Sequence, residues 1–358
     1  MGPVIAALKS SDWAVPYVVT TGQHADIVEE PLRLFGVVPD RKLTIERQSG
    51  SLNELMSKAI KAIDALIDEV RPSCIIAQGD TTSVAAASLA AFHRRLLFVH
   101  VEAGLRTGKM DDPFPEEFNR RLAGLTASLH CAPTRSSFEN LLREGVSDLD
   151  GLVTGNTVID ALLMVAERDL PPPEGFPNVR RVILSTAHRR ESFGEPLESA
   201  LTGLRAAVEA HDDVGLYFLA HPNPRAHEPA RRILGGHPRI VVRDAIGYAD
   251  IVSAMKRCWI VVTDSGGLQE EAPALGKPVL VLREVTERPE AVEAGAVRVI
   301  GTDTSAVVSS IAELHGDAGL YASMSTPVFP YGDGHAAERI VSALAEKLGQ
   351  RSAEEVAA

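Results

Sequence analysis

Three carboxylates near the ends of strand-like runs could act together in proton transfer. Asp80 follows the apolar run Cys74–Gln78, Glu102 follows the run Phe98–Val101, and Glu116 opens a later helical pattern. In parallel α/β sheets, ligands bind beyond the carboxyl ends of the strands. Carboxylates gathered there suit acid–base chemistry on a polar ligand. The alternative is a solvated loop whose acids, Asp80 among them, only cap helix N-termini.

The second half of the chain offers an anion site. Ser265, Gly266 and Gly267 follow the strand-like run Trp259–Thr263 and open a helical pattern. Glycine lets a ligand approach the backbone closely, and free N–H groups at a helix start favour a phosphate or diphosphate. Glu271, about one turn into the helix, could accept hydrogen bonds from sugar hydroxyls. The alternative is an ordinary Ser/Gly turn; a Walker loop is excluded because no Gly-Lys-Ser/Thr follows.

Basic side chains lie near other strand ends in this half. His188 follows the run Val182–Ser185 and has Arg189 beside it, which favours a site role over a structural one. His221, after the next strand, is a weaker candidate. Arg288 follows a later strand and could neutralise a phosphate.

Strands alternate with helical patterns along nearly the whole chain. Uninterrupted apolar strands between helices indicate parallel sheets covered on both faces, an α/β fold. The apolar runs are Tyr17–Thr20, Cys74–Gln78, Leu96–Val101, Leu129–Ala132, Leu152–Thr154, Val182–Ser185, Leu216–Ala220, Ile240–Val242, Trp259–Thr263, Pro278–Leu282 and Val297–Ile300. Helical patterns include Leu52–Val70 and Thr82–Arg94.

A proline-rich break, Leu170–Asn178, divides the strands into two sets. We therefore expect an N-terminal Rossmann-like domain at 1–169, a linker at 170–178 and a C-terminal Rossmann-like domain at 179–345. The remaining residues, 346–358, are expected to form a tail that is disordered from Ser352. Two doubly wound domains of this kind are expected to face a central cleft, with the last helix packing back on the N-terminal domain.

The amino-acid composition argues against some classes of binding partner. The chain has 358 residues and a net charge of −12, which disfavours nucleic acid and anionic membranes as partners. No apolar run reaches the roughly 18 residues of a membrane span. The three cysteines match no metal motif and, being odd in number, argue against a disulfide framework; we expect buried thiols in a cytoplasmic protein.

Ten segments from about residue 20 to 340 resemble the non-hydrolysing UDP-N-acetylglucosamine 2-epimerases in content and order. They are TGQH, QGDTT, HVEAGLRTG, PFPEEFNR, TGNTVIDAL, TAHRRESFG, HPNP, TDSGGLQEEAPALGKPVLVLR, TERPEAVEAG and PYGDG. The resemblance implies a glycosyltransferase-B-like architecture, a homodimer, and interconversion of UDP-GlcNAc and UDP-ManNAc through elimination and re-addition of UDP. It implies no metal and no redox cofactor.

The resemblance also implies roles for individual residues. The family's catalytic groups match Asp80, Glu102, Glu116 and His188, with acid and base unassigned among the carboxylates. Its UDP contacts match Ser265, Gly266, Gly267, Glu271 and Arg288. Many bacterial members bind a second, activating UDP-GlcNAc, and the candidates for that site here are Gln23, His24, Arg47, Arg189 and His221.

One departure concerns the start of the chain. Family members begin with a strand and a loop reading roughly GTRPE, which supplies an arginine to the nucleotide site, whereas this sequence starts in a helical pattern, Met1–Lys9. We expect that the missing strand weakens stability and activity, and that an upstream extension restores both.

Three alternatives remain at the level of sequence. They are a hydrolysing epimerase that releases UDP and ManNAc, a glycosyltransferase of the same architecture, and an inactive UDP-sugar-binding protein. The carboxylate trio suits elimination better than simple transfer.

Overall fold

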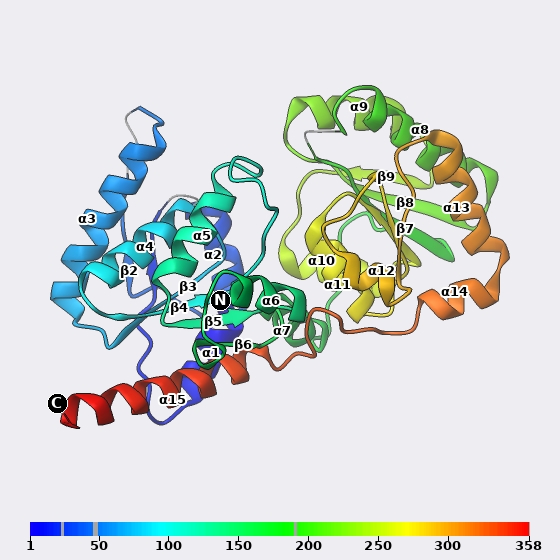
Figure 1. The fold of residues 1–358 in the computed structure, drawn as a ribbon. Helices are drawn as coiled ribbons and strands as arrows, with labels where there is room; N and C mark the ends of the chain where they lie inside the picture. The colour runs from blue at the N-terminus through cyan, green and yellow to red at the C-terminus, as the bar shows by residue number, and fades with distance from the viewer. Residues whose placement is uncertain (23–24, 46–48, 190–191, 358) are drawn as a thin grey trace. The chain divides into compact units, whose positions relative to one another are not determined.

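The computed structural model describes residues 1–22, 25–45, 49–189 and 192–357. Contacts divide the chain into two units: Met1–Ala161 with Tyr331–Ala358, here the N-terminal unit, and Leu162–Pro330, here the C-terminal unit. Each is an α/β unit of parallel strands flanked by helices (Figure 1). Helix α7, Thr157–Ala166, crosses the division. Among the described residues, no helix is both long and apolar enough to cross a membrane.

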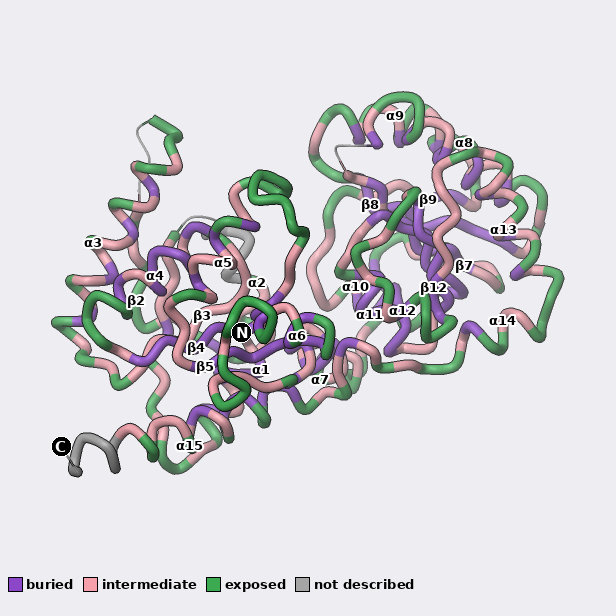
Figure 2. The backbone as a smooth tube through the Cα atoms, viewed as in Figure 1, coloured by how far each residue is buried: buried purple, intermediate pink, exposed green. Residues whose placement is uncertain are grey.

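The C-terminal unit holds a six-stranded sheet in the order β12-β11-β10-β7-β8-β9, in which every neighbouring pair is parallel. Its strands are β7 Arg181–Thr186, β8 Val214–Leu219, β9 Ile240–Arg243, β10 Ile260–Thr263, β11 Val279–Val281 and β12 Val297–Val299. The apolar strands β8 and β10 are buried along their whole length, and Figure 2 draws purple tube at the strand labelled β8. The strand order reverses between β7 and β10, and doubly wound sheets bind ligands at such a switch point.

Helices α8 and α13 pack against each other and bury aliphatic side chains on the sheet, among them Leu201, Leu204 and Ile311. The helices of this unit are α8 Glu195–Ala210, α9 Pro224–Leu234, α10 Tyr248–Arg257, α11 Gly266–Ala274, α12 Pro289–Glu293, α13 Thr304–Gly316 and α14 Ala318–Met324.

The N-terminal unit holds two sheets, β3-β4-β5-β6 and the pair β1-β2. The strands are β1 Val19–Thr20, β2 Arg41–Lys42, β3 Cys74–Gln78, β4 Leu97–Val101, β5 Leu129–Ala132 and β6 Gly151–Val153. Strand β4 is fully buried, whereas β3 is half-buried throughout although its sequence is apolar. The Thr21 and Ser83 hydroxyls, 3.0 Å apart, join the end of β1 to the start of α4. Each sheet thus presents the carboxyl ends of parallel strands along one edge.

The last helix belongs to the N-terminal unit. Its residues Ile340 and Leu344 share a buried cluster with Val4 and Leu8 of α1 and with side chains of β4 and β5. Helix α15 continues to Ala357, through the segment that was expected to be a tail. The helices of this unit, apart from α7, are α1 Gly2–Ser10, α2 Ala25–Leu34, α3 Leu52–Val70, α4 Thr82–His93, α5 Glu116–Thr126, α6 Arg135–Arg143, the 3₁₀ turn Asp148–Asp150 and α15 Ala336–Ala357.

Candidate active site

Asp80 lies between the end of β3 and the start of α4, but it does not cap that helix. The cap is Thr81, whose hydroxyl accepts the Val84 backbone N–H at 3.4 Å. The capping interpretation of Asp80 is therefore wrong. Its carboxylate instead pairs with the Arg120 guanidinium at 2.5 Å, and its backbone carbonyl accepts the Asn119 side-chain amide at 2.9 Å. Helix α5 thus holds the Asp80 loop through two side chains.

Glu102 occupies the end of β4 with a φ of +63°, a left-handed conformation that a non-glycine residue seldom adopts. Its Oε2 accepts the Gln78 side-chain amide at 3.1 Å and lies 3.9 Å from where a Cβ on Gly79 would be. Gln78 and Val101 are register partners in the paired strands. The Glu102 carboxylate is therefore held over the loop that carries Asp80, and strained backbone of this kind concentrates at functional sites.

The two acids that open α5 have different surroundings. Glu116 is half-buried, whereas Glu117 is buried and accepts the Thr107 backbone N–H at 3.1 Å and Arg121 Nε at 2.9 Å. Burial opposes the charge of Glu117, but the Thr107 N–H and the arginines hold its pKa below the ordinary value. Glu117 therefore fixes the loop before α5, which leaves Glu116 as the candidate for chemistry.

A buried histidine supports the loop after β3. Burial lowers the pKa of His100 to about 4, so the ring is neutral near pH 7, and its Nε2 lies 2.8 Å from the Gly79 carbonyl oxygen. His100 thus positions the loop that carries Asp80.

The residues of the expected anion site lie at the switch point of the sheet of the C-terminal unit. The Thr186 and Thr263 hydroxyls, 2.6 Å apart, join the ends of β7 and β10. Helix α11 begins at Gly266, and its cap residue Ser265 makes no side-chain capping bond. A Cβ on Gly266 would lie 3.7 Å from the guanidiniums of both Arg189 and Arg288. Two cations thus flank the start of a helix, an arrangement that suits a diphosphate.

Glu271 lies in the same helix and is buried. Burial raises its pKa to about 7, against the effect of a hydrogen bond from the Tyr248 hydroxyl at 2.6 Å. The neighbouring Glu270 pairs with Arg288. The Oε2 of Glu271 lies 3.9 Å from where a Cβ on Gly267 would be, so the Glu271 carboxylate faces the helix start.

His188 follows β7 beside the same helix start. Its Nδ1 lies 3.2 Å from Oδ1 of the buried Asp264, and its ring stacks on His221 with the centroids 5.6 Å apart. The structure therefore brings His188, His221 and Asp264 together at the ends of β7, β8 and β10.

Comparison with known proteins decides the family. The profile of the family described as UDP-N-acetylglucosamine 2-epimerase matches residues 6–345. The UDP-N-acetylglucosamine 2-epimerase of Escherichia coli K12 is 42% identical over 354 residues, which cover 96% of this chain and 94% of that protein. The chain belongs to this family.

Solved structures of the family share the fold. An S. aureus MnaA–UDP co-structure is 40% identical, with a TM-score of 0.87 and coverage of 98% of this chain and 93% of that one. The UDP-GlcNAc 2-epimerase from Neisseria meningitidis, bound to UDP-GlcNAc, is 36% identical, with a TM-score of 0.87 and coverage of 97% and 96%. The α/β fold with parallel sheets is thus the glycosyltransferase-B-like fold of this epimerase family.

Several residues that hold the candidate side chains in place were not among the expected ones. They are Gln78, Arg120, Tyr248 and Asp264. Gln78, Arg120 and Asp264 lie in the expected motifs, whereas Tyr248 lies outside them. All four act by holding other side chains, and a sequence pattern does not show such contacts. The expected second-site residues Gln23, His24 and Arg47 lie outside the described residues.

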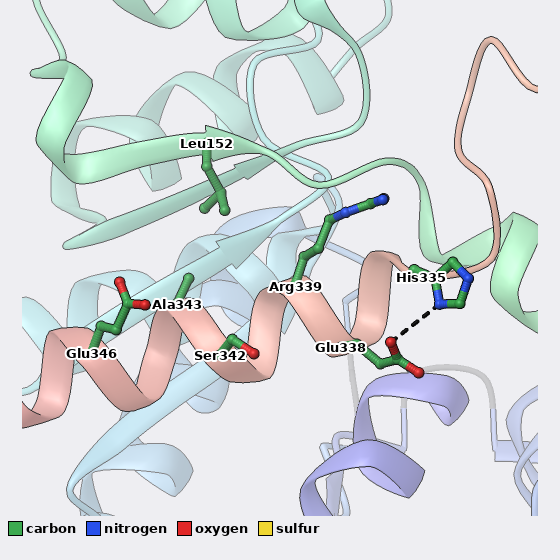
Figure 3. Close-up of a pocket in the computed structure, with 7 residues that line it drawn as sticks. All are labelled: Leu152, His335, Glu338, Arg339, Ser342, Ala343 and Glu346. Atoms are coloured by element: carbon green, nitrogen blue, oxygen red, sulfur yellow. Dashed lines mark hydrogen bonds and ion pairs between the residues drawn. The ribbon is translucent and has the colours of Figure 1, made fainter.

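Two other features do not extend the site. In the described part of the chain, no group of three or more His, Cys, Asp or Glu side chains could hold a metal ion. A hollow beside α15 and β6, drawn in Figure 3, contains none of the expected residues. Its lining side chains are Leu152, His335, Glu338, Arg339, Ser342, Ala343 and Glu346.

Proposed function

We propose that this protein interconverts UDP-GlcNAc and UDP-ManNAc without net hydrolysis. The observation that carries the proposal is the 42% identity, across 96% of the chain, to a protein named UDP-N-acetylglucosamine 2-epimerase. This reaction needs groups that move a proton and groups that hold a diphosphate. The N-terminal unit has three carboxylates for the first task, and the C-terminal unit has a helix start flanked by two arginines for the second. Neither the comparisons nor the geometry favours the hydrolysing alternative.

The proposed reaction is an elimination followed by an addition. The C1–O bond breaks and UDP leaves with the electron pair, while a carboxylate takes the proton from C2, so that a 2-acetamidoglucal forms. A proton is then delivered to the opposite face of C2, and UDP adds back at C1. Because positive charge develops at C1 as UDP leaves, carboxylates beside the sugar stabilise the transition state.

We assign the sugar chemistry to Asp80, Glu102 and Glu116. Asp80 and Glu102 lie at neighbouring strand ends, and Glu116 opens the helix whose Arg120 pairs with Asp80. The acid and the base among these three carboxylates are to be distinguished by single amide variants. The variant that lacks the base loses C2 proton exchange from one epimer.

We assign UDP binding to the switch point of the C-terminal unit. The N–H groups of Gly266 and Gly267, with Arg288, would hold the diphosphate, and Ser265 would contact it at the helix cap. The Glu271 carboxylate would accept hydrogen bonds from the ribose hydroxyls. His188 would donate to the diphosphate, where it assists departure of UDP.

Incubation with UDP-GlcNAc in deuterated water, followed by proton NMR, tests the proposal. We expect UDP-ManNAc to appear, deuterium to enter C2 of both epimers, and no free sugar to accumulate. Accumulation of ManNAc with UDP would instead establish the hydrolysing reaction. Binding of UDP without turnover would establish a UDP-sugar-binding protein.

We further propose a cytoplasmic homodimer that binds a second UDP-GlcNAc as an activator. The candidate contacts Arg189 and His221 lie near the proposed diphosphate site, at Gly266 and against His188 respectively. UDP-ManNAc alone should turn over slowly until trace UDP-GlcNAc is added, and equal rates without UDP-GlcNAc would contradict activation. The mass in solution, measured by light scattering, should be twice that of one chain.

A further inference from the structure

Asp264 is a buried carboxylate that lies one residue beyond β10. Its side chain is 1% exposed. Its Oδ2 accepts two backbone N–H groups from the neighbouring loop, that of His188 at 2.7 Å and that of Arg189 at 2.8 Å. The same carboxylate therefore fixes the backbone that carries His188, from the adjacent strand of the sheet.

The other oxygen of Asp264 faces the ring of His188. Its Oδ1 lies 3.2 Å from Nδ1, within ion-pair distance, and has no hydrogen-bond partner in the described part of the chain. A buried carboxylate oxygen without a donor is costly, so this contact favours a proton on Nδ1. Nε2 is then the ring nitrogen that faces away from Asp264, and the partner of one nitrogen determines the state of the other.

Two guanidiniums lie at the start of the helix that follows Asp264. Arg189 follows His188 in the chain, and the Arg189 and Arg288 guanidiniums both lie beside Gly266. The Asp264 carboxylate lies against the ring of His188, with Oδ1 3.2 Å from Nδ1. The stacked ring of His221 covers one face of His188.

We propose that Asp264 is a positioning residue for His188. It keeps Nδ1 protonated and directs Nε2 toward the ligand, so that the imidazolium can donate a hydrogen bond to the diphosphate of the departing UDP. This inference rests on the proposed function, in which His188 contacts that diphosphate.

The test uses Asp264→Asn. The amide oxygen can still accept the two backbone N–H groups, which directs the amide NH₂ at Nδ1 of His188. Two donors cannot face each other, so Nδ1 must lose its proton. We expect kcat for epimerisation to fall roughly 10- to 150-fold, the equivalent of one charged hydrogen bond, with little change in KM.

A double-variant cycle separates positioning from a general loss of structure. Asp264→Asn combined with His188→Asn should be no slower than His188→Asn alone, because Asp264 acts through the ring. If the losses in kcat of the two single variants multiplied in the double variant, the proposal would be overturned. Asp303→Asn is the matched control, because Asp303 also accepts two backbone N–H groups, at the start of α13, and should leave kcat unchanged.

NMR of ¹⁵N-histidine-labelled protein provides a readout that needs no turnover. The His188 signals, assigned by their absence from His188→Asn, should show a proton on Nδ1 in the unsubstituted protein and its loss in Asp264→Asn. A neutral ring protonated only on Nε2 in the unsubstituted protein would overturn the inference, even if Asp264→Asn failed to fold. If the unsubstituted protein shows the Nδ1 proton but no epimerisation, the proposed function fails and the placement of the ring stands.

Discussion

At the scale of single residues, Arg120 holds two acids near the residues proposed for catalysis. It pairs with Asp80 at 2.5 Å and lies 3.5 Å from Glu117. Arg120→Lys keeps the charge but loses the planar fork, so kcat should fall roughly 10-fold or more while the protein stays folded. Steady-state kinetics and circular dichroism check both points. Arg121→Lys, on the same helix but paired only with Glu117 among these acids, should retain normal turnover; equal losses in the two variants would contradict a specific role for Arg120.

The raised pKa of Glu271 predicts how UDP binding depends on pH. Its pKa of about 7 lies above the ordinary 4.5, so the acid is half protonated at neutral pH and would accept the proposed ribose hydrogen bonds fully only above it. UDP affinity should therefore fall as the pH drops from 8 to 6. Tyr248→Phe removes a hydrogen bond that lowers this pKa, so UDP should bind about fivefold more weakly at pH 7 and recover at higher pH.

Calorimetric titration with UDP at several pH values measures this effect, and Glu271→Gln provides the control for titration of the ligand. An identical pH profile of UDP affinity in Tyr248→Phe and in the unsubstituted protein would contradict this prediction.

The effect of pH on the free energy of unfolding has the opposite sign to its effect on UDP binding. Because the folded-state pKa of Glu271 is raised, its contribution to stability is complete below about pH 4.5 and is lost as the pH rises through 7.

At the scale of elements, the loop after β4 depends on one glycine. Gly104 has a φ of +89°, and a Cβ there would lie 2.2 Å from the Ser137 carbonyl oxygen of α6. Gly104→Ala should therefore cost about 4 kcal/mol of unfolding free energy or more. Gly108, in the same loop, also has a positive φ but open space around it; Gly108→Ala should cost only about 1 kcal/mol. Urea unfolding of both variants measures the difference, and equal costs would mean that the contact with α6 is unimportant.

The sequence was sufficient to locate elements with a strong pattern. The apolar runs Cys74–Gln78 and Leu129–Ala132 and the helix Leu52–Val70 have the predicted bounds. Strand β2, Arg41–Lys42, was not predicted, because two exposed basic residues carry no apolar pattern. The sequence does not single out Asp264, because Ser and Gly dominate its motif. Its role also depends on the neighbouring strand β7, and the pairing of β7 with β10 is a property of the tertiary fold.

At the scale of the whole molecule, the proposed chemistry and the proposed binding belong to different units. The three carboxylates lie in Met1–Ala161, and the diphosphate and ribose residues lie in Leu162–Pro330. The strand order of the six-stranded sheet explains the second set, because the loops after β7 and β10 meet where that order reverses. Parallel pairing of β3 with β4 explains how Asp80 and Glu102 come together. The two functions should therefore be separable by mutation.

Glu116→Gln and Arg288→Lys test that separation. Glu116 is half-buried at the start of α5, so its amide variant should fold normally and bind UDP with unchanged affinity, yet lose at least about 100-fold in kcat. Arg288→Lys retains a cation for Glu270 but loses the fork beside Gly266, so UDP should bind roughly 10-fold more weakly. Calorimetry with UDP and initial rates with UDP-GlcNAc measure both variants. Weaker UDP binding in Glu116→Gln would contradict the assignment, because it would place this carboxylate in the nucleotide site rather than at the sugar.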